Sequence, residues 1–131
     1  MKPEYEEVVN NVINEIKRNG IRTRLEKYDA SGDEIVIRYD LDDGTKNDPF
    51  ATSPYYSPAV RLGDPEHFRK TYWTEYKVSE AMKNNGFELL GYTFNSVAKI
   101  HKFESKKHDG LTAYLIQTND NDKYLEFYVP K

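Results

Sequence analysis

The chain has 131 residues, three histidines, no cysteine and a formal net charge of −3. This length suits one domain with an ordinary hydrophobic core, and the lack of cysteine excludes disulfides, thiol nucleophiles and thiolate metal sites. The small acidic charge argues against nucleic-acid binding by bulk electrostatics, and no apolar run approaches the roughly 20 residues that cross a bilayer.

The first predicted element is an amphipathic helix over residues 3–18. A proline suits its first turn, and Lys17 and Arg18 suit its last turn, where positive charge is favourable. The Asn19-Gly20 pair supplies the left-handed residue that commonly ends a helix. Apolar side chains at helical spacing should face the core, namely Tyr5, Val8, Val9, Val12, Ile13 and Ile16.

Two strands are predicted next, over residues 21–29 and 33–41. In both segments apolar side chains alternate with polar or charged ones, as in a strand with one buried face. The connection between them, "DASGD", is short and polar. The pair is therefore predicted to form an antiparallel hairpin.

A proline-rich stretch follows, over residues 47–68, and contains four of the six prolines. Pro54 and Pro58 bracket two adjacent tyrosines, and prolines reduce the entropy that a segment loses on ordering. Stiffened aromatic side chains are typical anchors of protein interfaces. The predicted partner-binding residues are Phe50, Tyr55, Tyr56 and Arg61. The alternative is that the aromatic residues of this stretch fold back and cover one end of the core.

A second helix is predicted from "DPEHF" to "NNG", with Asp64 as its N-cap and Pro65 as its first residue. One broad face would carry Phe68, Tyr72, Tyr76, Ser79 and Met82, flanked by Trp73 and Val78. If a pocket lies between this helix and the sheet, the aromatic side chains that could line it are Tyr72, Trp73, Tyr76 and Tyr92.

Four strands are predicted to complete the chain, over residues 87–94, 97–105, 111–118 and 123–130. The first of them is apolar on both faces, which predicts a central position in the sheet. The order α-β-β-α-β-β-β-β predicts a single α+β domain with two helices packed on one face of a mainly antiparallel sheet.

A weak internal similarity links residues 12–21 with residues 78–87, because both follow the pattern V-x-E-x-apolar-K-x-N-G-apolar. A duplication would give pseudo-repeat units 3–41 and 64–105, joined by the segment 42–63. The alternative is convergence, since glycine after a helix and an apolar residue at the start of a strand are common.

No catalytic, metal or cofactor site is predicted. A serine nucleophile elbow is absent, no glycine-rich phosphate loop precedes a helix, and the histidines do not have a recognised ligand spacing. The stretch "DLDDGTKND", residues 40–48, resembles a calcium loop, but its glycine comes one position early and no closing glutamate follows. It is predicted to be an acidic turn.

Basic and aromatic side chains alternate in residues 99–110, which suits a surface that follows phosphates and stacks on bases. The candidate nucleic-acid residues are Lys99, His101, Lys102, Lys106, Lys107 and His108. The alternative is an ordinary solvated turn, in which lysines keep a sheet edge soluble.

These patterns favour a small, non-enzymatic cytoplasmic protein that acts by protein–protein association, as an inhibitor, a regulator or an accessory factor of a phage or mobile element. The acidic start of the chain differs from a signal peptide. Another protein is the expected partner, a homo-oligomer is possible, and no membrane association is expected. The two alternatives are nucleic-acid binding through residues 99–108 and a small-ligand-binding or enzymatic α+β domain.

Overall fold

The computed structural model describes residues 1–46 and 65–131, and for residues 65–71 it describes the backbone alone. The described elements have the order predicted from the sequence, and they confirm the α+β class and the antiparallel sheet. The elements are α1 (Pro3–Arg18), β1 (Arg22–Asp29), β2 (Glu34–Asp42), α3 (Pro65–Asn84), β3 (Phe87–Phe94), β4 (Ala98–Ser105), β5 (Thr112–Thr118) and β6 (Lys123–Pro130).

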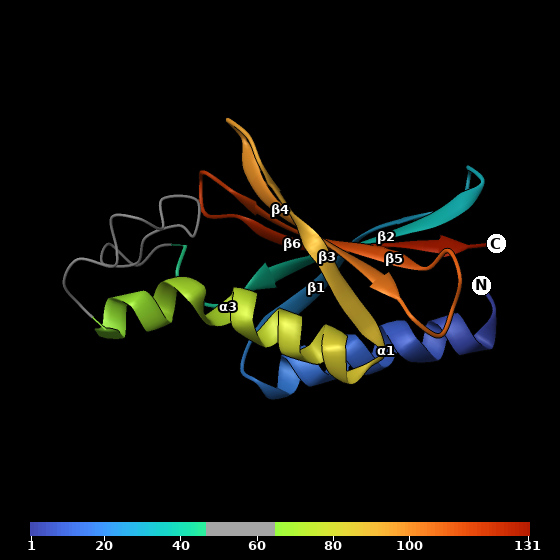
Figure 1. Ribbon diagram of the computed structural model, residues 1–131, viewed down its shortest axis with the longest axis horizontal. Helices are drawn as coiled ribbons and strands as arrows, with labels where there is room; N and C mark the ends of the chain where they lie inside the picture. The colour runs from blue at the N-terminus through green and yellow to red at the C-terminus, as the bar shows by residue number, and fades with distance from the viewer. Residues whose placement is uncertain (47–64) are drawn as a thin grey trace.

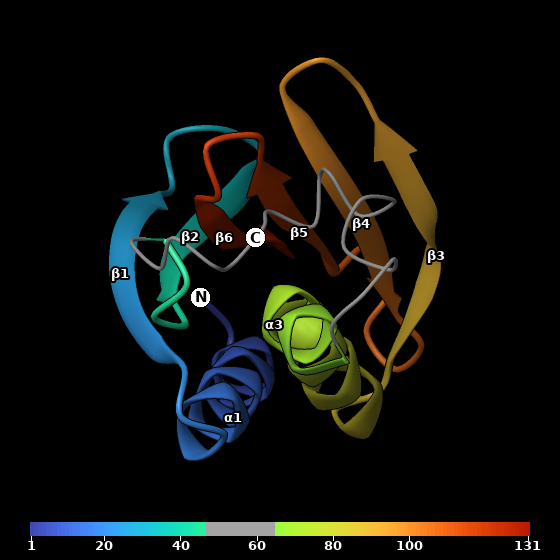
Figure 2. The same ribbon diagram turned by 90° about the vertical axis from the view of Figure 1, so that its left-hand side faces the viewer.

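The sheet has six strands in the order β1-β2-β6-β5-β4-β3, and every neighbouring pair is antiparallel. In Figure 2 it bends into an arch, with β1 and β3 at the two edges and both helices beneath its concave face. Figure 1 shows α1 and α3 together on this one side of the sheet. Of the described helices, none combines the length and apolar character needed to span a bilayer.

Helix α1 follows its sequence pattern. It runs from Pro3 to Arg18 and buries the predicted apolar stripe, apart from Val8, which is half-buried at its margin. Gly20 has a φ of +83°, so the chain leaves the helix through the left-handed conformation that glycine adopts without steric cost. Gly86 repeats this geometry after α3, with a φ of +84°.

The hydrophobic core fills the space between the concave face and the two helices. The inward positions of β5 and β6 come at every second residue, as the period of a strand requires, although the outward Glu126 is buried as well. The side chains at its centre are fully buried and come from α1, α3 and the middle strands: Val12, Ile16, Val78, Met82, Phe103, Leu115, Leu125 and Phe127.

Helix α3 buries only part of the predicted face, namely Met82 and the flanking Val78. The buried side chains are Thr74, Val78, Ala81 and Met82, whereas Trp73 and Tyr76 are exposed. The prediction ranked side chains by apolar area alone, and tyrosine and tryptophan tolerate exposure because each has a polar end. This orientation brings Thr74 and Glu75 toward the sheet.

Strand β3 is an edge strand, so its predicted central position is wrong. Its apolar side chains lie largely in solvent: Leu89, Leu90, Tyr92 and Phe94 are about half exposed or more. A strand that is apolar on both faces is buried when it lies inside the sheet, with a paired strand at each edge. Strand β3 has a paired strand at one edge, β4.

Neither described helix lies over the convex face of the sheet, which carries its own polar cluster. Arg38 Nε donates to Glu126 Oε2 at 2.6 Å, and the hydroxyl of Tyr128 donates to Glu126 Oε1. The hydrogen bond to this carboxylate raises the pKa of Tyr128 to about 12. The cluster ties β2 to β6 on the side away from the core.

Candidate functional site

Three polar residues form a row across the concave face at one end of the core. The strand register places Gln117 of β5 directly between Lys99 of β4 and Lys123 of β6. Gln117 and Lys123 are buried, and the side chain of Lys99 is 12% exposed. The row occupies inward positions, at which β5 and β6 otherwise carry alanine, leucine, phenylalanine and valine.

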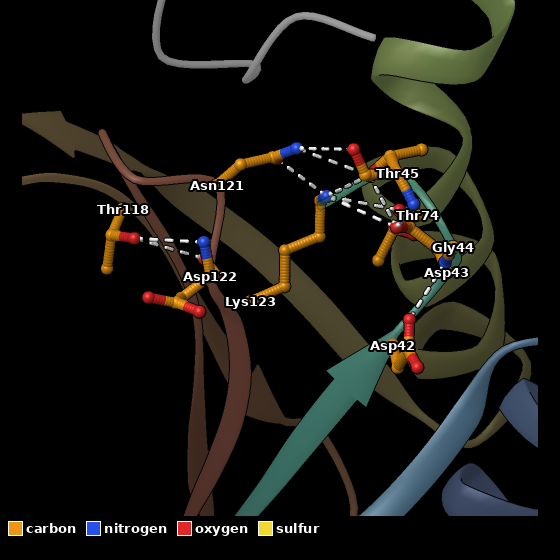
Figure 3. Close-up of polar contacts among 9 residues, drawn as sticks. All are labelled: Asp42, Asp43, Gly44, Thr45, Thr74, Thr118, Asn121, Asp122 and Lys123. Atoms are coloured by element: carbon orange, nitrogen blue, oxygen red, sulfur yellow. Dashed lines mark hydrogen bonds and ion pairs between the residues drawn. The ribbon is translucent and has the colours of Figure 1, made fainter. Parts of the chain in front are cut away.

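One end of the row is held by a buried ion pair (Figure 3). Lys123 Nζ lies 3.1 Å from Asp43 Oδ2 and donates to Thr45 Oγ1 at 2.9 Å and to Asn121 Oδ1 at 2.8 Å. Asp43 also accepts from the backbone N–H of Thr45 at 3.0 Å and from the hydroxyl of Thr74 on α3. We call these five residues the Lys123 network.

The Lys123 network is saturated. Each proton of the ammonium has an acceptor, and the carboxylate of Asp43 accepts from two threonines in addition to the ion pair. Burial alone would raise the pKa of Asp43, but the charge of Lys123 and the hydrogen bonds from Thr45 and Thr74 outweigh it and hold the pKa below its ordinary value. A network without spare donors or acceptors is structural: it fastens the end of β2 to β6 and α3.

The other end of the row meets Glu75 of α3. His101 Nε2 donates to Glu75 Oε1 at 3.1 Å, and Lys99 Nζ lies 3.5 Å from Glu75 Oε2. Burial raises the pKa of this carboxyl, yet the hydrogen bond and charge of His101, with Lys99, hold it below its ordinary value. Lys99 Nζ also lies 5.8 Å from the ring centre of Tyr72 and 5.1 Å from that of Tyr92.

Unmade hydrogen bonds gather between these two ends. Within the described part of the chain, five buried side-chain atoms lack a hydrogen-bond partner, and four of them belong to Gln117, His101 and Glu75. Gln117 is fully buried, and neither its Nε2 nor its Oε1 is bonded to a described residue; His101 Nδ1 is in the same state. We call Glu75, Lys99, His101 and Gln117 the candidate site.

The residues predicted to line a pocket divide into two groups. Tyr72 and Tyr92 both lie against Lys99, at the border of the candidate site. Trp73 and Tyr76 lie elsewhere on α3, with Lys77 Nζ at 4.7 Å and 5.3 Å from their ring centres. Two of the four predicted residues are therefore at the site.

The six candidate nucleic-acid residues do not share a surface. Lys99 and His101 face inward, whereas Lys102 is exposed on the opposite face of β4. Lys106 pairs with Glu88 at 3.6 Å, and the side chain of Lys107 lies along Gly86. His108 packs edge-on against Tyr5, with ring centres 5.4 Å apart. Nucleic-acid binding through residues 99–108 stays a prediction. Of the six residues, the three exposed lysines, Lys102, Lys106 and Lys107, are placed to contact a nucleic acid.

The predicted partner-binding residues Phe50, Tyr55, Tyr56 and Arg61 lie outside the described residues, so their role stays a prediction.

The described part of the stretch that resembles a calcium loop, residues 40–46, is organised by an internal cation, because the ammonium of Lys123 pairs with the carboxylate of Asp43. Across residues 1–46 and 65–131, no group of three or more acidic, histidine or cysteine side chains could hold a metal ion.

A depression of about 380 Å³ lies at the ends of β2 and β6 and reaches the Lys123 network from the outside. Charged side chains dominate its lining, and several are already matched to each other. Arg24 lies 3.8 Å from Asp40, and Lys46 pairs with Asp122. No buried atom without a partner faces it among the residues that line it, so the interior row is the stronger candidate.

The sequence contained a signal for this site that hydrophobic patterning overlooks. In residues 111–117 the inward phase reads Leu111, Ala113, Leu115 and then Gln117; in residues 123–129 it begins with Lys123 and continues with leucine, phenylalanine and valine. A polar residue in an otherwise apolar phase must be bonded or used. Glu75 and Thr74 had no such signal, because the buried face of α3 was predicted only in part.

The chain is thus an α+β domain of two layers, a six-stranded sheet and a pair of helices, whose distinguishing feature is a polar row under α3. Comparisons with protein-family models, curated proteins and solved structures found no match. The functional argument therefore depends on the site itself.

Proposed function

We propose that the protein binds a small molecule between α3 and the sheet, at the candidate site formed by Glu75, Lys99, His101 and Gln117. One observation carries the proposal: the amide of Gln117 is fully buried, and both of its polar atoms lack a partner among the described residues. Leaving a buried amide group without hydrogen bonds costs about 1–3 kcal/mol.

An unbonded amide at this position does not stabilise the fold. A leucine or methionine would continue the inward phase of β5 and avoid the cost altogether. The neighbouring Lys123 network shows how this fold satisfies a buried polar group that serves stability, with every donor matched. Buried groups without a protein partner occur at functional or strained sites and where a bound ligand, ion or water completes their hydrogen bonds, which supports a binding role for Gln117.

The test follows the side-chain amide of Gln117 directly. Its ¹⁵N–¹H signals, assigned by their loss in Gln117→Met, are monitored while acids, amines, amides, sugars and heteroaromatic compounds are added at millimolar concentration. We expect at least one class to shift these signals and the ring signals of His101 in a saturable manner. Lys102→Met is the matched control, because Lys102 lies on the same strand as Lys99 but on the outer face.

The proposal is abandoned if every compound that binds leaves Gln117 and His101 unshifted. It is also abandoned if Lys102→Met weakens binding as much as Lys99→Met does, because binding would then not depend on the inward face of β4.

A second function, association with another protein, is supported by a separate observation. The edge strand β3 leaves its outer backbone edge without a neighbouring strand in the sheet and exposes several large apolar side chains; Glu88 is its only charged residue. Exposed, hydrophobic edge strands are sites where further chains pair. The exposed apolar residues on and beside this edge are Leu89, Leu90, Tyr92, Phe94 and Val97.

A further inference from the structure

We propose that the ligand of the candidate site is a neutral molecule with a carboxamide or lactam group attached to an aromatic or heteroaromatic ring. The inference rests on the proposed function, and it names the chemical class that the site would select. Three independent features carry it: the donor and acceptor of Gln117, the balance of charge around them, and the aromatic rings at the border.

The first feature is the paired donor and acceptor. The amide of Gln117 offers an N–H donor and a carbonyl acceptor side by side in one plane, and neither has a partner among the described residues. Another amide satisfies both at once through two parallel N–H···O bonds. A carboxylate has only acceptors and would leave the carbonyl unbonded, and an ammonium has only donors and would leave the N–H group unbonded.

The second feature is the charge balance. Lys123 is matched by Asp43, and Lys99 is matched by Glu75, so the charges of the interior lysines and carboxylates balance. A charged ligand placed beside Gln117 would enter without a counter-ion. Desolvating an unpaired ion costs several kcal/mol, whereas a neutral amide has no such penalty once its hydrogen bonds are made. The site therefore selects for neutrality as well as for hydrogen-bonding pattern.

The third feature is the aromatic border. The ring of Tyr92 is 62% exposed and lies 5.5 Å from the imidazole of His101. Tyr92 and Gln117 are two strands apart in the sheet and are offset by two residues along the strands, a separation of about 12 Å at the usual strand geometry. A ring that stacks on the outer side of the site, between Tyr92 and Gln117, can thus direct its amide toward Gln117.

Lys99 controls access to Gln117. The two free amide atoms are closed to solvent, and Lys99 is their direct cross-strand neighbour. Its ammonium is held by an ion pair at 3.5 Å and by ring faces, which are weaker than the bonds that fix Lys123. The side chain is long and flexible, so its methylene groups can shift while the ammonium stays paired with Glu75, and the ligand then reaches Gln117 beside it.

The experiment compares three compounds with the same ring and different charge: benzamide, benzoate and benzylamine. Each is titrated at neutral pH into the full chain while the side-chain amide signals of Gln117 are recorded. We expect benzamide to shift these signals in a saturable manner and to bind at least tenfold more tightly than benzoate or benzylamine. We also expect Gln117→Met to lose at least tenfold in benzamide affinity, and Lys102→Met to bind as the unaltered chain does.

The outcomes separate this inference from the proposed function. If benzoate or benzylamine shifts the Gln117 signals and binds with higher affinity than benzamide, the site binds small molecules and the ligand class is wrong. If none of the three shifts these signals, the ligand class is also wrong, and the broader compound set then decides the proposed function. If benzamide binds to Gln117→Met and to the unaltered chain with equal affinity, the amide of Gln117 does not hydrogen-bond to the ligand and the inference fails.

Discussion

Gln117 and Lys123 are cross-strand neighbours in one row, but they differ in how their polar atoms are hydrogen-bonded. Lys123 is a buried charge whose every proton is accepted, whereas Gln117 is a buried neutral amide with no bond to any described residue. Polar burial alone therefore does not distinguish structure from function. The two residues differ in the count of made and unmade hydrogen bonds, which predicts opposite effects of substitution at the two positions.

Replacing Gln117 with methionine is expected to stabilise the protein. Methionine has a similar volume and no polar atoms, so it removes two unmade hydrogen bonds from the interior at little packing cost. The free energy of unfolding should rise by about 1–3 kcal/mol, measured by urea denaturation. A fall of similar size would mean that the amide is bonded in solution, and the case for a binding site would lose its basis.

Replacing Asp43 with asparagine is expected to destabilise the protein strongly, by about 3–5 kcal/mol, because it leaves the ammonium of Lys123 buried without a counter-ion. The double variant Asp43→Asn/Lys123→Met should recover much of this loss, since it removes the unpaired charge as well. Urea denaturation of the four proteins gives the coupling free energy. Additive losses would show that the ion pair is not the source of the effect.

Acidification should have the same effect as the substitution. The pKa of Asp43 is lower in the folded state than its ordinary value of 3.8, so the folded state binds fewer protons than the unfolded state near that pH. The stability from this group is fully present above pH 3.8 and is lost as the pH falls through the lower folded value. In Asp43→Asn the acid limb of the stability profile should be correspondingly shallower, with the contribution of Glu75 remaining.

At the scale of the elements, the sequence predicted what local rules govern. Helix α1 begins and ends where its proline, its terminal charges and Gly20 indicate, and the order of strands follows from alternation and turns. The rules failed for β3 and for part of the face of α3, because both depend on which neighbours the topology supplies. The candidate site combines β4, β5 and α3, so it could not be assembled before that topology was known.

The two helix-ending glycines provide a test of these local rules. Gly20 and Gly86 have φ values of +83° and +84°, where a Cβ is strained whatever the space around it. Gly20→Ala and Gly86→Ala should each destabilise by about 1–2 kcal/mol. Gly32→Ala is the control, since this glycine has open space and no left-handed φ. Thermal unfolding that ranks all three variants together would contradict the assignment of these stops.

At the scale of the whole molecule, the sheet has a symmetric plan. Each helix is followed by a hairpin whose first strand takes an edge, β1 on one side and β3 on the other, with β5 and β6 between the two hairpins. Each edge strand also contains one irregularity in its register. This plan matches the weak similarity between residues 12–21 and 78–87, and a duplication stays a prediction. The two edges nevertheless differ in chemistry, because β1 alternates charges with its exposed apolar residues and β3 does not.

That difference predicts which edge associates. An edge strand without interspersed charges can accept another strand, whereas charges on an edge oppose such pairing. We expect the protein to self-associate or to capture a partner through β3, and Leu90→Lys should abolish this by placing a charge in the exposed apolar strip. Leu25→Lys on β1 is the matched control, because Leu25 is exposed to a similar degree on the other edge.

Sedimentation velocity over a range of concentrations measures the association of both variants and of the unaltered chain. If Leu25→Lys disrupts association as much as Leu90→Lys does, the surface is not β3; if the unaltered chain stays monomeric and captures nothing through this strand, the interior site is left as the functional feature of the described residues.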